Sequence, residues 1–517
     1  MMKNILLVNI IILTLTSFAS VQSDLSKKDW PENCYMIWAL KSDTPHQSAA
    51  VSHTDWFIWQ RGAWGKPGVR YIINKCAAAG IRTLWWRTHS GGLANYPTEI
   101  PEATYFNCPY RGMSYEDWDS LSFAIDYAHE LGMEIYAWFT PFEETHGWAD
   151  SVRSKYMDIH PEYSDINKLG NEVGIPSFFF EEYRNYKTEI VRELLTRWNF
   201  DGLVLDFERL GAPKRSENWG YIPEIMATFE DETGLNAFGI SEKDVKWMDF
   251  RSSFVGTFVN NIAQLKNSIE RPFELVFMGV EGQEHTSHVN LNQWLDKCDT
   301  IAMGNYSKEP KETQYGWIGN PESAFSNIES NSISKTFIAY SYYGDGARLM
   351  EAVENAKMQG SDICWFESTP LNYRNMFWVP AKLGLEKNVR LVKTISKTLI
   401  ESKSIVSMSF KVLGRCKWDL SINGNIVAHG DIGRESFLGS FKIDKDKDTV
   451  IAFATQGPFG GSCGLSAVVY LIDENGLSTT VVTDASWQAV LQDNKRVSST
   501  LMGKPGAAPF IPKDERE

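Results

Sequence analysis

The sequence lacks the basic surplus that nucleic-acid binding requires. Its 51 Lys and Arg residues stand against 65 Asp and Glu residues, a net charge of −14, whereas a protein that neutralises phosphates needs a positive surface. No nucleophile elbow of the serine-hydrolase type occurs, and Gly91-Gly92 lacks the flanking pattern of a phosphate-binding loop. Nucleic acid is therefore excluded as the main partner, and serine-based catalysis has no support.

Metal-binding patterns are also scarce. The seven cysteines are scattered, with no Cys-x-x-Cys pair and no zinc-type spacing to histidine: Cys34, Cys76, Cys108, Cys298, Cys364, Cys416 and Cys463. An odd number leaves at least one free thiol, and Cys416 could pair with Cys463. We expect no metal and no organic cofactor.

Long apolar runs are absent except at the N-terminus. Lys3 precedes the apolar run Ile5–Ser20, and Val21-Gln22-Ser23 forms a small-residue exit, which together are typical of a signal peptide over residues 1–23. The run is too short to span a membrane convincingly, and no second run of comparable length follows. We expect a secreted protein, extracellular or periplasmic, with no membrane span.

Short apolar runs alternate with amphipathic stretches from Cys34 to about Gly384, which is typical of repeated βα units. We count eight expected strands: Tyr35–Leu40, Thr83–Arg87, Glu134–Phe139, Gly202–Phe207, Glu274–Gly279, Thr300–Gly304, Thr336–Ser341 and Asp362–Phe366. Most are uninterrupted apolar runs, as expected of strands that are buried on both faces.

Helices are expected between these strands, because apolar residues recur there at three- and four-residue spacing: Arg70–Ala79, Tyr115–Leu131, Glu181–Trp198, Phe250–Ile269, Leu291–Lys297 and Ala347–Met358. Gly80 and Gly132 stand where helix C-terminal glycines belong. Eight such repeats predict an α/β protein with a closed (β/α)₈ TIM barrel over residues 33–384, in which catalytic groups gather at the C-terminal strand ends.

A different pattern follows over residues 385–505. Short alternating strands are separated by turn signals such as Asn423-Gly424 and Asn475-Gly476. This predicts a smaller C-terminal β-sandwich. Residues 506–517 are expected to form a tail.

The fourth expected strand ends in an unusual acidic pair. Asp206 and Glu208 alternate with apolar residues, so both side chains point the same way, about 6.7 Å apart along the strand. Two close carboxylates push their pKa values apart, which lets one act as an acid while the other stays ionised. Glycosidic cleavage requires that division. Asp201, which precedes the strand, is expected to serve a turn or cap.

The other strand ends carry aromatic and polar groups. Trp faces stack on the apolar faces of sugars, and the chain has 19 Trp. Any one of these residues alone could equally belong to the core, but their recurrence at nearly every strand end favours carbohydrate contact. The expected substrate contacts are Trp38, Trp86, Arg87, His89, Trp138, Tyr306 and Trp365.

Residues 33–380 resemble glycosyl-hydrolase-like family 10, the bacterial barrel proteins of glycosidase type. The resemblance is carried by the Trp138 segment, by His160-Pro161-Glu162-Tyr163, by Asp201-Gly202 through Asp206, and by Asp299-Thr300-Ile301 with Asn305-Tyr306. It implies a barrel of the glycosidase type.

The fourth strand is also similar to the family 18 chitinase signature Asp-Gly-x-Asp-x-Asp-x-Glu. That resemblance implies that Glu208 is the proton donor and Asp206 its supporting carboxylate. Val204 replaces the middle acid, and Asn305 stands where the chitinase pattern has Tyr, so a separate carboxylate nucleophile is expected. Glu281 and Glu367 are the best-placed candidates, and an inverting mechanism stays open.

The second domain resembles the jelly-roll, galactose-binding-like sandwiches of many bacterial glycosidases, through Trp418-Asp419, Asn423-Gly424, Gly464-Leu465 and Thr483-Asp484-x-x-Trp487. The resemblance implies either sugar binding or a structural role.

These observations predict a secreted glycoside hydrolase that cleaves O-glycosidic bonds of a poly- or oligosaccharide. Two alternatives remain at this stage. One is a non-catalytic carbohydrate-binding barrel. The other is a metal-dependent hydrolase or deacetylase, in which His89, His146 or His285 would converge on Asp206.

Overall fold

A computed structural model describes the chain in fifteen stretches: residues 24–41, 44–51, 66–90, 92–105, 119–142, 144, 155–207, 219–280, 291–304, 333–340, 354, 357–358, 360–366, 385–457 and 464–505. They belong to two compact units. One lies between Pro45 and Met376 and contains a closed barrel; the other combines the segments before Thr44 and after Phe377 with Ile73–Gly80.

The barrel consists of eight parallel strands that close on themselves in the order β10-β11-β12-β13-β14-β2-β3-β7. Their bounds are β2 Gln47–Val51, β3 Thr83–Arg87, β7 Glu134–Phe139, β10 Gly202–Asp206, β11 Glu274–Val280, β12 Thr300–Gly304, β13 Ser334–Tyr340 and β14 Asp362–Phe366. Each strand pairs with its neighbours along the chain, and the last closes onto the first. The predicted (β/α)₈ fold is confirmed.

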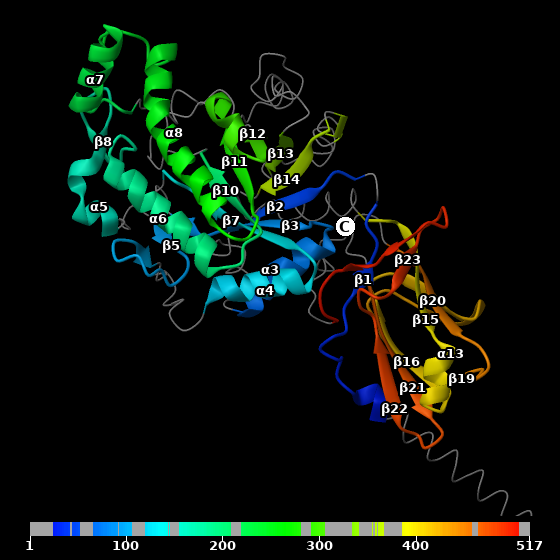
Figure 1. The fold of residues 1–517 in the computed structure, drawn as a ribbon. Helices are drawn as coiled ribbons and strands as arrows, with labels where there is room; N and C mark the ends of the chain where they lie inside the picture. Colours follow the sequence, from blue (N-terminus) through cyan, green and yellow to red (C-terminus); the bar gives the residue numbers. More distant parts are fainter. Residues whose placement is uncertain are drawn as a thin grey trace, which may run out of the picture. The chain divides into compact units, whose positions relative to one another are not determined.

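Helices accompany the strands (Figure 1): α3 Lys66–Ala78, α4 Ser120–Glu130, α5 Lys155–Ile159, α6 Glu181–Arg197, α7 Pro223–Thr233 and α8 Val245–Ser268, with the 3₁₀ helices η1 Pro161–Tyr163 and η2 Leu291–Lys297. Asp119 caps α4, because its carboxylate accepts hydrogen bonds from the backbone N–H groups of Leu121 and Ser122. Gly80 and Gly132 have φ values of 83° and 66°, as expected of glycines that follow helices.

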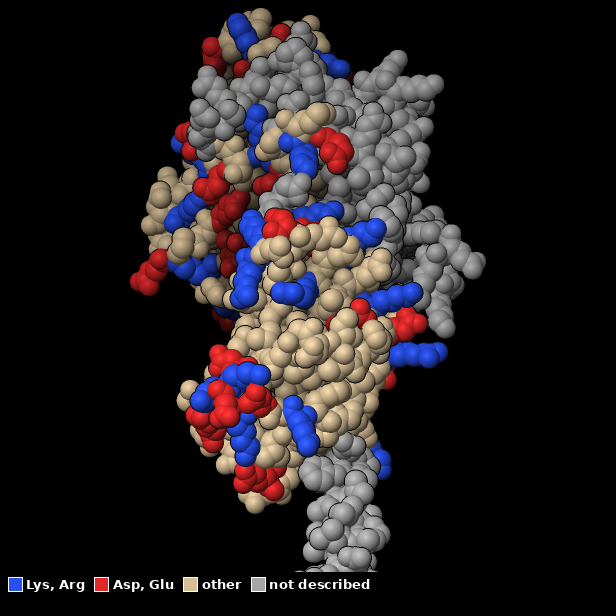
Figure 2. Space-filling model, turned by 90° about the vertical axis from the view of Figure 1, so that its right-hand side faces the viewer, with Lys and Arg blue, Asp and Glu red and all other residues tan. Residues whose placement is uncertain are grey.

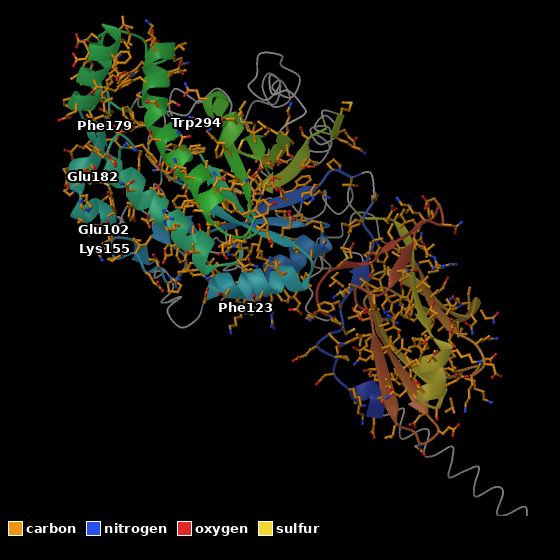
Figure 3. The ribbon with its side chains drawn as sticks, in the orientation of Figure 1. Glu102, Phe123, Lys155, Phe179, Glu182 and Trp294 are labelled. Carbon is orange, nitrogen blue, oxygen red and sulfur yellow. The ribbon has the colours of Figure 1, made fainter. Side chains whose placement is uncertain are left out.

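Cationic side chains of α3 cover aromatic rings of α4. Phe123 lies on the outer side of α4 (Figure 3), and the Arg70 guanidinium lies 5.3 Å from its ring centroid. The same guanidinium lies 5.5 Å from the ring of Tyr127. This arrangement lets a charged residue shield apolar surface while its charge stays near solvent.

One strand prediction is wrong. Tyr35–Leu40 was expected to open the barrel, but β1 (Ile37–Trp38) pairs antiparallel with β21 (Leu465–Asp473) and β25 (Thr500–Leu501) of the other unit. The first barrel strand is β2, which pairs with β14 and β3. Its sequence, Gln-Ser-Ala-Ala-Val, contains polar and small residues, so it has a weaker hydrophobic signal than the Ile37–Trp38 segment. Only the long-range pairing distinguishes the two.

Aspartates at the N-terminal ends of strands bind the backbone of the adjacent strand. Asp201 Oδ2 accepts a hydrogen bond from the Ile135 N–H and lies 2.8 Å from His129 Nε2. Asp299 Oδ2 accepts one from the Leu275 N–H, and Asp362 Oδ1 accepts one from the His46 N–H. Asp201 was expected to serve a turn or cap; its carboxylate instead binds the backbone of the adjacent strand, at the barrel end opposite to Asp206.

The Tyr136 ring lies across Gly202 at this N-terminal end. Its hydroxyl donates to Glu274 Oε2 at 2.7 Å, and a Cβ atom at position 202 would come within 2.5 Å of the ring. Real Cβ atoms do not approach a ring this closely, so the barrel needs glycine at this position.

We therefore expect Gly202→Ala to destabilise the barrel by about 1–3 kcal/mol, the usual cost of overpacking a core. The measurement is urea denaturation. Gly239→Ala is the matched control, because its added Cβ would meet nothing closer than 3.4 Å; it should change stability by less than about 0.5 kcal/mol. Equal effects of the two changes would contradict the steric argument.

The second unit is a β-sandwich of two antiparallel sheets. One sheet has the order β19-β16-β21-β1-β25 with β22 beside β21, and the other has the order β18-β17-β20-β15-β23-β24. The bounds are β15 Asn388–Ile395, β16 Ile405–Gly414, β17 Lys417–Ile422, β18 Asn425–Gly430, β19 Glu435–Lys442, β20 Thr449–Gln456, β21 Leu465–Asp473, β22 Ser478–Val482, β23 Gln488–Val490, β24 Arg496–Ser498 and β25 Thr500–Leu501. Asn423 and Gly424 both have positive φ, as the predicted hairpin turn requires.

The N-terminal segment belongs to this sandwich. β1 lies between β21 and β25, and the Trp38 indole is fully buried in the sandwich core, where its N–H donates to the Glu386 carbonyl at 2.7 Å. Leu25 and Cys34 pack beside Tyr470 in a second apolar cluster.

No helix among the described residues is long and apolar enough to cross a membrane. Lys and Arg are interspersed with Asp and Glu on the face shown in Figure 2, so the described part of this face carries no extended basic area.

Candidate functional site

Alternate side chains of the barrel strands fill the barrel interior. They form one buried apolar cluster: Ala50, Trp85, Tyr136, Trp138, Val204, Val276, Met278, Ala302, Ile338, Cys364 and Phe366. Because side chains alternate along a strand, Arg87 shares the inner face of β3 with Trp85, and Asp206 shares that of β10 with Val204.

The candidate site is the layer of this interior nearest the C-terminal strand ends. Asp206 is 1% exposed, and its Oδ2 accepts a hydrogen bond of 2.9 Å from the Trp138 indole N–H. The Arg87 guanidinium lies 5.2 Å from the centroid of the Trp138 ring, and the Phe366 ring meets the same indole edge-to-face at 5.2 Å. A carboxylate, a cation and two aromatic rings from four strands therefore meet at one place.

The structure brings together three of the predicted site residues: Arg87, Trp138 and Asp206. The other predicted catalytic carboxylates, Glu208, Glu281 and Glu367, lie outside the described residues, as does the predicted contact Tyr306. Their roles remain predictions from the sequence.

Trp38 does not lie at the barrel mouth. Its place in the sandwich core corrects the prediction that it contacts the substrate there, and the error follows from the wrong strand assignment. A Trp at the end of an apolar run has the same local sequence signature in either domain.

Trp86 and Trp365 point away from the barrel interior. They alternate with Trp85 and with Cys364 and Phe366, which face inward, so their own side chains lie on the outer side of the strands. The Trp365 indole N–H donates to Gln47 Oε1 at 3.0 Å, and both indoles are buried. This orientation does not fit their predicted role as substrate contacts.

His89 is enclosed rather than presented to a ligand. It is 1% exposed, its ring meets those of Tyr96 and Phe139 edge-to-face, and its Nδ1 lies 3.2 Å from Thr88 Oγ1. Among the residues described, no three His, Cys, Asp or Glu side chains are grouped in a way that could hold a metal ion.

Two interior aromatic residues were missed as site residues. Phe366 touches Trp138, and Trp85 lies one step deeper on the strand that carries Arg87. Strand alternation was the signal that could have found Phe366. Residues two apart in a strand share one face, so Phe366 faces the barrel interior with Cys364, and Trp365 faces outward.

A buried ion pair ties the segment after β7 to helix α6. Lys187 Nζ binds Glu144 Oε1, and the two side chains are 1% and 0% exposed. The Lys187 ammonium also lies within 5.6 Å of the rings of Phe139, Tyr183 and Tyr186. Breaking a buried pair on one side typically costs about 3–5 kcal/mol, so loss of either partner would destabilise the barrel unit.

Asp165, at the start of the barrel unit's small hairpin (β8 Ser164–Ile166, β9 Glu172–Pro176), is a second buried carboxylate. Its Oδ1 accepts hydrogen bonds from the Ile166 and Gly220 N–H groups at 2.7 and 2.9 Å. Burial raises the pKa of this carboxyl to about 6, while these hydrogen bonds and the Arg251 cation lower it by less.

The contribution of Asp165 to stability therefore depends on pH. Because its folded-state pKa lies above its unfolded value, the folded state binds the proton more tightly, and stability is lost as pH rises from about 4 through about 6. The shift from 3.8 to about 6 corresponds to about 3 kcal/mol.

We expect Asp165→Asn to remove this dependence, because its amide oxygen keeps the acceptor for both N–H groups. The unfolding free energy of the variant relative to wild type should rise by about 3 kcal/mol between pH 4 and pH 7. Urea denaturation at both pH values measures it. A constant difference between variant and wild type would contradict a raised pKa.

Taken together, the strand pairing defines a closed (β/α)₈ barrel with a buried carboxylate held among aromatic rings at its C-terminal strand ends. Residues 48–299, just under half of the chain, match the family model described as Glycosyl hydrolase-like 10, so the predicted resemblance to that family is confirmed.

Curated proteins match parts of the chain at low identity. A segment of 208 residues is 24% identical to an S-layer-related protein of Niallia circulans, covering 34% of this chain and 12% of that protein. A segment of 135 residues is 22% identical to glycosyl hydrolase DigH of Escherichia coli (strain K12), covering 25% of this chain and 30% of that one. The matches thus span less than a third of either relative's length.

Solved structures with partial similarity include the PgaB (BpsB) glycoside hydrolase domain from Bordetella bronchiseptica, at 12% identity and a TM-score of 0.42, covering 64% of this chain and 96% of that one. A lectin from Pleurotus ostreatus is 19% identical with a TM-score of 0.21, covering 23% of this chain and 38% of that one. The fold assignment rests on the strand pairing described above.

Proposed function

We propose that this protein is a secreted glycoside hydrolase that cleaves O-glycosidic bonds in a poly- or oligosaccharide. The observation that carries the proposal is Asp206, a buried carboxylate at the C-terminal end of β10 whose Oδ2 is held by the Trp138 indole N–H. Burying an ionisable group costs free energy, and in this fold catalytic groups gather at these strand ends.

The expected chemistry divides acid and supporting roles between carboxylates. Glu208 stands two residues beyond Asp206 in the sequence, which gives it the same inward direction if the strand geometry continues. Glu208 is the proposed general acid, and Asp206 stabilises the charge that develops on the sugar. Glu281 or Glu367 is the proposed nucleophile of a retaining mechanism.

Carbohydrate is the proposed ligand of the aromatic layer. The Trp138 and Phe366 rings offer apolar faces, and Arg87 offers several N–H donors, so together they match the mixed surface of a sugar ring. Cleavage of residues 1–23 as a signal peptide is the proposed route of secretion, and no organic cofactor is required for hydrolysis by carboxylates.

The test is hydrolysis of a panel of glycans by wild type, Glu208→Gln and Glu224→Gln. The release of reducing sugar measures the rate of each protein. Glu224 is an exposed residue of α7 and provides a matched control. We expect wild type and Glu224→Gln to cleave one glycan class equally and Glu208→Gln to be slower by about two or more orders of magnitude, as for a lost general acid.

Other outcomes would replace the proposal. Equal cleavage by all three proteins would move the acid away from Glu208. Binding of a panel glycan without cleavage would favour a non-catalytic carbohydrate-binding barrel. Activity that a chelator abolishes and added metal restores would favour a metal-dependent hydrolase.

A further inference from the structure

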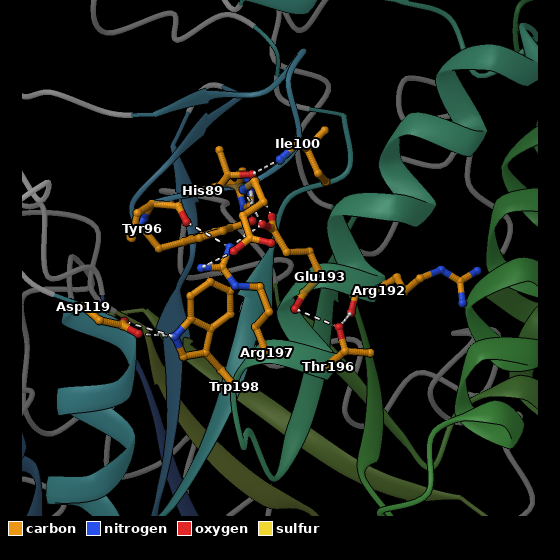
Figure 4. Close-up of polar contacts among 12 residues, drawn as sticks. His89, Tyr96, Ile100, Asp119, Arg192, Glu193, Thr196, Arg197 and Trp198 are labelled. Atoms are coloured by element: carbon orange, nitrogen blue, oxygen red, sulfur yellow. Dashed lines mark hydrogen bonds and ion pairs between the residues drawn. The ribbon is translucent and has the colours of Figure 1, made fainter.

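A chain of buried polar groups links the Trp138 carbonyl to Tyr96 through Thr88 and His89, and Figure 4 shows its part around His89, Tyr96 and Glu193. It begins at the Trp138 carbonyl, which accepts hydrogen bonds from both the N–H and the hydroxyl of Thr88 at 3.0 Å. His89 Nδ1 lies 3.2 Å from that hydroxyl oxygen, and His89 Nε2 lies 3.4 Å from the Tyr96 hydroxyl. His89 and Tyr96 are 1% and 0% exposed.

The count of protons gives this chain a direction. The Thr88 hydroxyl has one proton, which it donates to the Trp138 carbonyl, so His89 Nδ1 must be the donor to Thr88 Oγ1. In the neutral imidazole, Nε2 is then an acceptor, and the single proton of the Tyr96 hydroxyl can go either to Nε2 or to the Glu193 carboxylate, which it also contacts. The contacts at the two ring nitrogens fix one ring orientation of His89.

The far end of the chain is fixed on helix α6. Burial and, next to it, the nearby Glu193 carboxylate raise the pKa of Tyr96 well above its usual value, so that its hydroxyl keeps the proton. Glu193 is itself held, because it accepts hydrogen bonds from the Thr98 hydroxyl at 2.7 Å, the Glu99 N–H at 2.5 Å and Arg197 Nη1 at 2.6 Å.

His89 connects this anchor to the candidate site in two ways. Its carbonyl accepts a hydrogen bond of 2.8 Å from Arg87 Nε, which holds the guanidinium beside Trp138. Its ring binds Thr88, which in turn binds the backbone of Trp138. Since the Trp138 indole donates to Asp206, a change at the His89 ring reaches the carboxylate through two intervening residues, Thr88 and Trp138.

We propose that His89, held in place by Tyr96 and Glu193, is a positioning residue that sets Arg87 and Trp138 around Asp206. The expected effect of His89 on catalytic turnover rests on the proposed function of the barrel. The geometry itself can be tested in the full chain without any substrate.

The test uses ¹⁹F NMR of the full-length protein labelled with 5-fluorotryptophan. The Trp138 resonance is assigned as the signal that disappears in Trp138→Phe. We expect Tyr96→Phe, which removes only the hydroxyl between His89 and Glu193, to shift or broaden the Trp138 signal. Should Tyr96→Phe fail to fold, Glu193→Gln serves the same test, because its single amide oxygen can keep the bonds from the Glu99 N–H and from Arg197, which both go to Oε1.

Tyr136→Phe is the matched control. It also removes a buried tyrosine hydroxyl that binds a glutamate, on the same strand as Trp138 but at the opposite end of the barrel. The Trp138 signal should stay in place in this variant. An unmoved signal in Tyr96→Phe, or an equal shift in both variants, would overturn the proposal, since the second result would show only general loosening of β7.

A kinetic arm separates this proposal from the proposed function. On a panel glycan that wild type cleaves, Tyr96→Phe should lower kcat about tenfold with KM unchanged, because small misplacements of a site can cost up to about a hundredfold, while Tyr136→Phe keeps kcat. Unchanged kcat in Tyr96→Phe counts against positioning. If wild type cleaves nothing, the proposed function fails, and the NMR result still decides whether His89 positions the site.

Discussion

Asp206→Asn should lower kcat on any glycan that the wild type cleaves by about two or more orders of magnitude, with little loss of stability. The amide oxygen can still accept the hydrogen bond that the Trp138 indole donates to Oδ2 at 2.9 Å, so the packing is retained. What disappears is the negative charge, and preorganised charge of this kind commonly contributes about 10²–10³ in rate. Initial rates and thermal melting measure the two effects.

Asp201→Asn is the matched control for this change. Asp201 belongs to the same strand connection but binds the Ile135 N–H and His129 at the opposite barrel end. We expect it to cost stability and to leave kcat within about twofold. Equal loss of activity in the two variants would mean that the loss reflects damage to β10 in general, and Asp206 would then have no special role.

Trp38→Ala should produce the largest loss of stability, confined to the sandwich. The indole is 0% exposed, lies in the sandwich core and donates a hydrogen bond to the Glu386 carbonyl. Removing a fully buried Trp side chain typically costs about 3–5 kcal/mol. Hydrogen exchange of peptides from β16 and β21, followed by mass spectrometry, should show faster exchange, because local opening depends on local stability.

Trp30→Ala provides the comparison for Trp38. Trp30 is only partly buried and packs at the edge of the second apolar cluster, with its indole N–H donating to Glu435 Oε2. The loss should be about 1–2 kcal/mol, since less apolar area is removed from contact. Neither variant should change KM for a cleaved glycan. A raised KM in Trp38→Ala alone would restore the idea that Trp38 contacts the substrate.

The hydrophobic pattern of the sequence predicted most of the barrel strands. Seven of the eight expected strands coincide with barrel strands within a few residues, because parallel strands that are buried on both faces are read as short apolar runs. The eighth, β2, has Gln, Ser and small Ala residues and was missed. The segment with the stronger pattern, Ile37–Trp38, pairs instead with a strand that begins at Leu465.

In the candidate site, too, the local sequence pattern predicted some side chains correctly and others wrongly. Asp206 and Arg87 were found from their place at the ends of strands, and Trp138 from the same signal. Trp86 and Trp365 were predicted as contacts, although the aromatic residues that face the interior are their chain neighbours Trp85 and Phe366. A shift of one position along a strand places a side chain on the opposite face.

The sequence alone determined the class of fold, the acidic character of the fourth strand and the place of Asp201 before that strand, because these depend on local periodicity and on the order of residue types. The tertiary structure decided that the N-terminal segment completes the sandwich, which tryptophans face the barrel interior and that His89 is enclosed by the rings of Tyr96 and Phe139. These depend on contacts between residues far apart in the chain, and a local pattern has the same appearance whichever distant partner it meets.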